Sequence, residues 1–412
     1  MARREAKALV REYCNKILIE SITLSFDFLP LPNPPLELPD FPARPPSDVS
    51  KIIQQALGIS SIDTAGFLFR LEQVIEKDEP NFIKRHIDRE TEREKWLSKN
   101  FELIAEQILI LQIKDWFYSA LDENSPDTDR WYLAVSIFIG LILKGSKITE
   151  AQCFPLFSSI IVAKQPDEPT MKQISGPHHI SWSGDKSDTF TEEVAHPSGV
   201  LAANSILDIT ELYELNHETV LPYWLERLSI GEHISNILNI PMRIQNLIFD
   251  INQKNSEKLV MATILLFPHH PKESKEILFE ICNSEQVSLR RFLASNLSRI
   301  GSEDREFSEK ILAELLNDED SDTRVISTTY LGTLARVESH SFILLAKKIF
   351  QNEDSRMIQR LIESGIRHYF SMNPDDNEGL IPIAWVSCNS ESKSKLSGML
   401  IELAKINQQS FQ

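Results

Sequence analysis

The chain has 412 residues, about three times the length of a typical domain and enough for two or three separately folded parts. Its 42% hydrophobic and 25% charged residues are ordinary for a globular protein and exclude wholesale disorder. The formal net charge of −17 opposes general attraction to a nucleic-acid backbone or to an anionic membrane surface.

The first predicted element is a helix with an apolar extension over residues 1–28, which begins without the apolar core of a signal peptide. Residues 29–46 follow and contain eight prolines, a density that excludes helix and favours an extended polyproline conformation. The apolar residues between these prolines favour a strap that lies on a folded surface. A ligand for a proline-binding module and a plain spacer are the alternatives.

Residues 47–163 are predicted to form a helical domain, because apolar residues recur there at helical spacing and two-residue alternation is scarce. The thirteen mostly apolar residues from Trp131 to Leu143 are too few to span a bilayer, which needs about 20 residues, so we expect a buried helix. The expected helices that follow the first one of this domain lie at 62–77, 80–91, 93–121, 130–144 and 149–163.

Residues 164–199 form a polar segment without helical periodicity, punctuated by proline and glycine. Connections of this length are uncommon and are usually functional or disordered. Imidazole and carboxylate groups together can bind a divalent metal, so a metal-dependent hydrolase centred on this segment is one hypothesis. The favoured interpretation is a surface loop or a disordered segment that binds a partner. The candidate metal ligands are His178, His179, His196, Asp185 and Asp188.

Connecting helices are expected over residues 200–249, and the chain then repeats itself at a fixed spacing within 250–412. The segments Ile281–Glu285, Leu315–Glu319 and Ile349–Glu353 each consist of two apolar residues followed by a polar turn. A constant period of this size indicates a stacked helical array, because one helix pair cannot bury its apolar face until a neighbour covers it. We therefore predict an all-α protein with an N-terminal irregular helical domain and a C-terminal α-solenoid.

The second repeat carries the clearest family pattern. After an acidic turn, Asp322-Thr323-Arg324 leads into an apolar helix that reaches Leu331-Gly332. This pattern resembles HEAT-type α-solenoid repeats, and the resemblance covers residues 250–405 and implies no activity. In that family, the turn acid and the arginine of neighbouring repeats form a ladder that fixes their stacking angle. The ladder residues that the resemblance implies are Asp320 and Asp322 on the acidic side and Arg290, Arg324 and Arg356 on the basic side.

A second interpretation starts from the other basic residues of the repeats, which can line one face and follow a phosphate backbone. The resemblance supports it in part, because some HEAT-like proteins bind or repair DNA. Acidic residues are interleaved almost one for one, however, and no row of aromatic residues offers a stacking surface for bases. The residues of this candidate basic face are Arg291, Arg299, Arg336, Lys347, Lys348, Arg360 and Arg367.

The sequence lacks the motifs of the common enzyme classes, such as a phosphate-binding loop, HExxH or GxSxG. Its four cysteines are too far apart for a disulfide framework or a zinc finger, which favours a reducing cytoplasm as the location. We expect a non-catalytic scaffold or adaptor subunit that binds another protein of the same complex through its solenoid surface. No catalytic residue, cofactor, membrane contact or small-molecule substrate is predicted.

Overall fold

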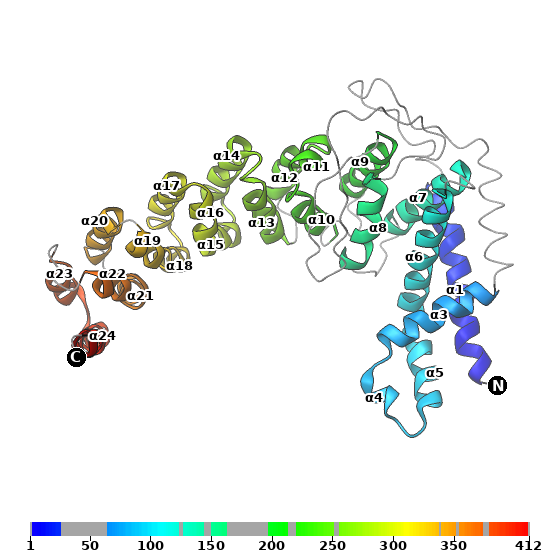
Figure 1. The fold of residues 1–412 in the computed structure, drawn as a ribbon, viewed down its shortest axis with the longest axis horizontal. Coiled ribbons are helices and arrows are strands. Elements are labelled where there is room, and N and C mark those ends of the chain that lie inside the picture. Colours follow the sequence, from blue (N-terminus) through cyan, green and yellow to red (C-terminus); the bar gives the residue numbers. More distant parts are fainter. Residues whose placement is uncertain are drawn as a thin grey trace. The chain divides into compact units, whose positions relative to one another are not determined.

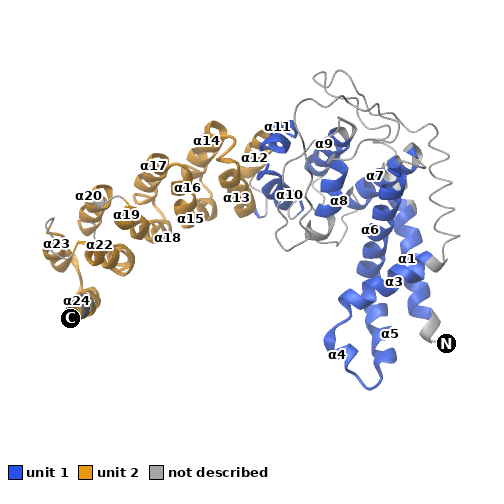
Figure 2. Ribbon diagram, viewed as in Figure 1, with its two compact units in different colours: residues 1–240, 252–255 blue, residues 241–251, 256–412 orange. Residues whose placement is uncertain are grey.

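The computed structural model describes residues 2–25, 64–122, 127–143, 150–162, 197–212, 220–250, 255–337, 339–351, 354–373 and 379–410. Every regular element within these ranges is a helix, which confirms the prediction of an all-α protein (Figure 1). The chain divides into two compact units, one of residues 1–240 and 252–255 and one of residues 241–251 and 256–412 (Figure 2). The proline-rich segment 29–46 and the candidate metal ligands of segment 164–199 lie outside the described residues.

Unit 1 is built around three long helices that pack against one another, α1 (Ala2–Ser25), α6 (Phe101–Ala120) and α7 (Thr128–Leu143) (Figure 1). Helices α1 and α7 lie so close that a Cβ atom added to Gly140 would be 2.1 Å from the backbone oxygen of Ser21, so only glycine fits there. The other helices of unit 1 are α3 (Thr64–Asp78), α4 (Asn81–Lys84), α5 (Arg89–Lys99), α8 (Glu150–Val162), α9 (Pro197–Leu212), α10 (Val220–Leu228) and α11 (Glu232–Ile237).

The apolar helix α7 is buried inside unit 1, as the sequence predicts. The side chains of Trp131 and Phe138 on this helix are fully buried. The ring of Trp224 on α10 lies 4.4 Å from the ring of Phe157 on α8 and 6.1 Å from that of Phe138, which ties the three helices together. Within the described part of the chain, no helix is long and apolar enough to cross a membrane.

Two of the helices expected in unit 1 are divided in the structure. The expected helix 93–121 is interrupted at Asn100, whose side-chain amide donates a 2.8 Å hydrogen bond to the backbone oxygen of Trp96. The expected helix 80–91 is interrupted between α4 and α5, because Asp88 accepts a hydrogen bond from the Thr91 backbone and starts a new helix. Short polar side chains compete with the helical ladder in this way, and apolar periodicity does not reveal them.

Glu79 follows α3 directly and has a fully buried side chain held by two arginines of α5. Arg93 Nε donates to Glu79 Oε1 at 2.7 Å, and Arg89 Nη2 donates to Oε2 at 2.6 Å. The hydrogen bond from Arg93 is the largest influence, and with the bond from Arg89 it outweighs burial and lowers the pKa of Glu79 from 4.5 to about 2. The cluster therefore fixes the end of α3 against α5.

This cluster predicts acid sensitivity in unit 1. A carboxyl with a lowered pKa in the folded state contributes its full stability above its unfolded pKa and loses it as the pH falls, here between 4.5 and about 2. We expect Glu79→Gln to lower the free energy of unfolding at pH 7 by about 2 to 3 kcal/mol, since both arginines are partly exposed and keep some hydration. Denaturant titrations at several pH values, followed by tryptophan fluorescence, measure this. A variant whose deficit persists at pH 2 would contradict the assignment.

Unit 2 is an array of stacked helix pairs in two layers (Figures 1 and 2). In the first layer, α13 contacts α15, α15 contacts α18, and α18 contacts α21, while α14 contacts α17 and α20 contacts α23 in the second layer. We call these helices the helix array. Its first layer consists of α13 (Ser256–Leu266), α15 (Val287–Ser295), α16 (Leu297–Glu303), α18 (Ser321–Thr328), α19 (Leu331–Val337), α21 (Ser355–Leu361), the π-helical turn Ile362–Ile366, α22 (Arg367–Met372) and α24 (Ser390–Ser410). Its second layer consists of α14 (Pro271–Cys282), α17 (Arg305–Leu315), α20 (Ser339–Phe350) and α23 (Leu380–Ser387). Helix α12 (Ile240–Ile248) precedes both layers in the chain.

Three successive first-layer helices bend at the same place in the repeat period. The bends fall at Asn296, at Tyr330 and in the π-helical turn that contains Ser364. At or next to each bend, a polar side chain bonds the backbone oxygen of the preceding turn: Asn296 Nδ2 at 2.9 Å, Thr328 Oγ1 at 2.8 Å and Ser364 Oγ at 2.8 Å. Such back-bonding bends helices, so the bend is encoded once per period.

Candidate interaction surface

The polar turns of the helix array cap the helices that follow them. Asp320 accepts a 2.8 Å hydrogen bond from the backbone nitrogen of Thr323, and Asp354, at the same place in the next repeat, accepts one from the backbone nitrogen of Arg356 at 3.1 Å. Asn389 plays the same part for the last helix, where it bonds the Ser392 nitrogen at 2.8 Å. A carboxylate at a helix N-terminus also interacts favourably with the helix dipole.

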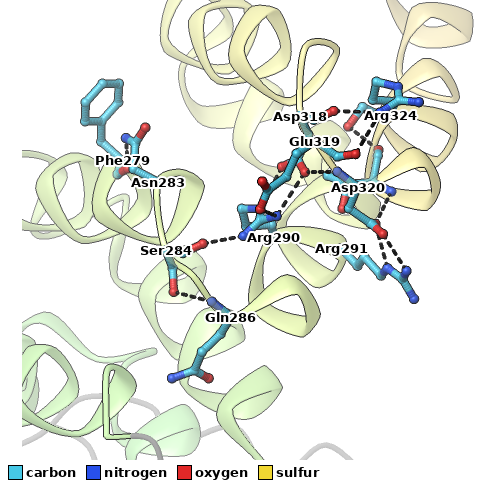
Figure 3. Close-up of polar contacts among 12 residues, drawn as sticks. Phe279, Asn283, Ser284, Gln286, Arg290, Arg291, Asp318, Glu319, Asp320 and Arg324 are labelled. Carbon is cyan, nitrogen blue, oxygen red and sulfur yellow. Dashed lines mark hydrogen bonds and ion pairs between the residues drawn. The ribbon is translucent and has the colours of Figure 1, made fainter.

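A buried ion pair joins two successive repeats at these turns (Figure 3). Arg290 Nε donates to Asp318 Oδ2 at 2.7 Å, and Arg290 Nη2 donates to Asp318 Oδ1 at 3.0 Å. The same arginine bonds the backbone oxygen of Ser284 and, at 3.3 Å, the exposed carboxylate of Glu319. Both partners of the main pair are only 5% exposed, so the interaction is a structural clamp.

The next repeat makes a related contact with a different acid. Arg324, which takes the place of Arg290 in that repeat, donates to the backbone oxygen of Asp318 at 2.8 Å and to Asp354 Oδ2 at 2.9 Å. The equivalent position in the following repeat is Ile358, which has no charge. The equivalent arginines of two successive repeats therefore each bind an acid of the following turn, and this series ends at Ile358.

The acids of this ladder differ from those that the family resemblance implies. Arg290 pairs with Asp318 and Glu319, and Arg324 with Asp354, whereas Asp320 pairs with Arg291 at 2.7 Å. Asp320 also caps the helix that follows it. The remaining implied residues, Asp322 and Arg356, do contact each other, and Asp322 also lies 3.0 Å from Arg291.

The ion pairs shift the pKa values of Asp320 and Arg290 so that both side chains stay charged. The hydrogen bond from Arg291 is the main cause that lowers the pKa of Asp320 well below its ordinary value. The hydrogen bond from Asp318 likewise raises the pKa of Arg290. Groups shifted in these directions stay charged near neutral pH, so neither acts as a general acid or base there.

The seven residues of the candidate basic face do not lie together in the structure. Arg291 belongs to the charge clusters at the helix starts, and Arg360 lies beside Thr329 and Glu363. Lys347 and Lys348 lie on α20, in the second layer. Three members remain on the C-terminal halves of successive first-layer helices, and we call them the arginine row: Arg299 on α16, Arg336 on α19 and Arg367 on α22.

Side-chain contacts connect the arginine row across the whole first layer. Arg299 Nη1 lies 3.5 Å from the sulfur of Met261 on α13, and the hydroxyls of Ser298 and Thr333 lie 3.4 Å apart between α16 and α19.

Arg336 Nη2 lies 2.5 Å from His368 Nε2, and Arg367 Nη2 donates to Glu402 on α24 at 3.3 Å. Burial, with the positive charges of Arg336 and Arg367, lowers the pKa of His368, so the ring stays neutral and accepts the Arg336 hydrogen bond.

Exposed apolar side chains accompany the arginine row. Val337 follows Arg336 and is 57% exposed, and Met372 ends the helix that starts with Arg367 and is 60% exposed. Met261 lies beside Arg299 and is partly exposed. Arginine and methionine are enriched in protein interfaces, and methionine adapts its shape to different partners.

Unit 1 contains a groove of about 840 Å³ between α3, α6 and α8. Lys77, Lys114 and Tyr118 contribute to its walls, and the Tyr118 hydroxyl lies 2.7 Å from that of Ser159. Its lining among the described residues includes no histidine or cysteine that could serve as a base or nucleophile. Over the described ranges, no group of three or more histidine, cysteine, aspartate or glutamate residues is arranged to hold a metal.

Fold and contacts together define an all-α protein whose second unit stacks helix pairs, with ion pairs between successive repeats. Beyond this class, no family model, curated protein or solved structure matches the chain. The comparisons thus identify neither a family nor a repeat type.

Proposed function

We propose that the protein is a non-catalytic scaffold or adaptor that binds a partner protein through the first layer of its helix array. The observation that carries this proposal is the arginine row with its apolar neighbours, a mixed cationic and apolar surface that crosses successive first-layer helices through side-chain contacts from Met261 to Glu402. A HEAT-type relationship for the array is part of the same proposal, supported by the regular recurrence of caps and bends. Stacked repeats favour binding because each one adds contact area to a continuous surface.

A protein partner is favoured over nucleic acid because the arginines between successive repeats are already paired with carboxylates. Arg290, Arg324 and Arg356 pair with aspartates, and Lys395 pairs with Glu363 at 2.8 Å. A nucleic-acid site needs several cations free to contact phosphates, and the whole chain carries a net charge of −17. These pairings take the arginines between the repeats out of any continuous phosphate track.

An intracellular complex is the proposed setting. The three cysteines whose side chains are described, Cys14, Cys282 and Cys388, are buried free thiols. Burial raises the pKa of Cys14 and that of Cys282 to about 12, which keeps both protonated and unreactive. Free buried thiols are typical of proteins from reducing compartments.

The proposal is tested by affinity capture of the tagged full chain from the cells that produce it, with and without nuclease. We expect one protein to be retained in a fixed ratio to the chain in both conditions, because the contact is between proteins. Each retained protein is then purified and mixed with the purified chain to establish direct contact. Retained material that disappears with nuclease would contradict the proposal and favour a nucleic-acid partner.

A further inference from the structure

We propose that the arginine row receives a segment of the partner protein that carries both apolar residues and aspartate or glutamate. This inference rests on the proposed function and adds the chemistry of the partner and the place where it binds. The occupant follows from two properties of the surface, its unpaired positive charge and its exposed apolar side chains.

The charge of the arginine row is only partly compensated within the chain. Among the described residues, no carboxylate pairs with Arg299 or Arg336, whose contacts are a thioether and a neutral imidazole. Both arginines are exposed. Elsewhere on the first layer, Arg291 and Arg356 each have an aspartate partner. Two exposed guanidinium groups without a carboxylate partner can each bind a carboxylate of another protein.

Arg367 shows how such a carboxylate is bound. Its guanidinium donates to Glu402 of α24 at 3.3 Å, and both side chains are more than half exposed. A partner segment that continues from this position along the first layer would place acids at Arg336 and then at Arg299. The chain therefore already holds one carboxylate at the end of the arginine row.

The apolar neighbours select for more than negative charge. Val337, next to Arg336 in sequence, and Met372, at the end of the helix that Arg367 starts, expose more than half of their surfaces, and burial of apolar surface contributes about 25 cal/mol per Å². A segment of acids alone would leave these side chains in water. A nucleic-acid backbone would likewise leave these apolar side chains without an apolar partner.

Photo-crosslinking from the full chain in its complex tests the position of the partner. We would replace Val337 or Met372 with p-benzoylphenylalanine, and use Leu344 on α20 and Val386 on α23 as matched controls, since these are also exposed apolar residues but lie in the second layer. We expect crosslinks from the first two positions alone, to a partner peptide rich in acids and apolar residues. Crosslinks to nucleic acid or to a basic peptide would overturn the inference.

Charge reversal tests the role of the arginines. The double variant Arg299→Glu with Arg336→Glu is expected to weaken binding of the purified partner by about tenfold or more. The control Lys272→Glu with Lys348→Glu changes net charge equally on the exposed second-layer helices α14 and α20, and we expect a change within about threefold. Equal effects of the two variants would overturn the inference.

These experiments separate the two levels of the proposal. A chain that retains no protein partner contradicts the proposed function itself. A retained partner that crosslinks only from Leu344 or Val386, or that binds the Arg299→Glu, Arg336→Glu variant normally, contradicts the arginine row alone. Circular dichroism of each variant confirms that the helix array is still folded.

Discussion

Replacing Asp318 with alanine is expected to destabilise unit 2 by about 3 to 5 kcal/mol, because it leaves the guanidinium of Arg290 buried without its main counter-charge. Both side chains of this pair are only 5% exposed, so water does not replace the lost carboxylate. Thermal unfolding by circular dichroism measures the loss, and hydrogen exchange in α15 and α18 localises it. Localisation matters because a chain of two units need not unfold in a single step.

The chain provides a matched control for this prediction. Glu319 contacts the same guanidinium at 3.3 Å, but its side chain is 86% exposed. Exposed ion pairs contribute about 0 to 1 kcal/mol, so Glu319→Ala should have little effect. If Asp318→Ala is no more destabilising than Glu319→Ala, the ladder does not hold the repeats together.

Leu297→Ala and Leu331→Ala are each expected to destabilise unit 2 by about 2 to 5 kcal/mol, as truncations in a packed core do. The two leucines occupy equivalent positions in successive repeats, start α16 and α19, and are fully buried. Thermal unfolding followed by circular dichroism measures the effect.

The control for these truncations is the same chemical change at an exposed position. Leu344 on α20 is 56% exposed, and surface substitutions usually change stability by about 0.5 kcal/mol or less. We expect Leu344→Ala to be nearly neutral. Similar losses in all three variants would mean that the assigned helix faces are incorrect.

The sequence predicted the helical class and the period of the array because both depend on apolar spacing. In the structure the caps Asp320 and Asp354 and the buried Leu297 and Leu331 recur at the same period. The bends at Asn296 and Tyr330 were not predicted, because they depend on single polar side chains that bond the backbone. Apolar periodicity continues through such bends without interruption.

Side-chain pairing between repeats was harder to predict than the repeats themselves. The family resemblance assigned Asp320 and Asp322 to the ladder; Asp322 does contact Arg356, whereas Arg290 reaches Asp318 in the folded array. A small shift along a turn changes which acid faces the neighbouring helix, and spacing alone does not resolve it. The arginine row was part of a larger predicted basic face. In the structure, two members of that face lie in the other layer and others are paired with acids.

The most direct measurement of the central claim is a binding titration between the purified chain and its purified partner from affinity capture, by calorimetry and in the presence of nuclease. We predict a saturable complex of fixed stoichiometry that weakens when Arg299 and Arg336 are both changed to glutamate. Absence of any complex between the two purified proteins would contradict the proposal that this helix array is a protein-binding scaffold.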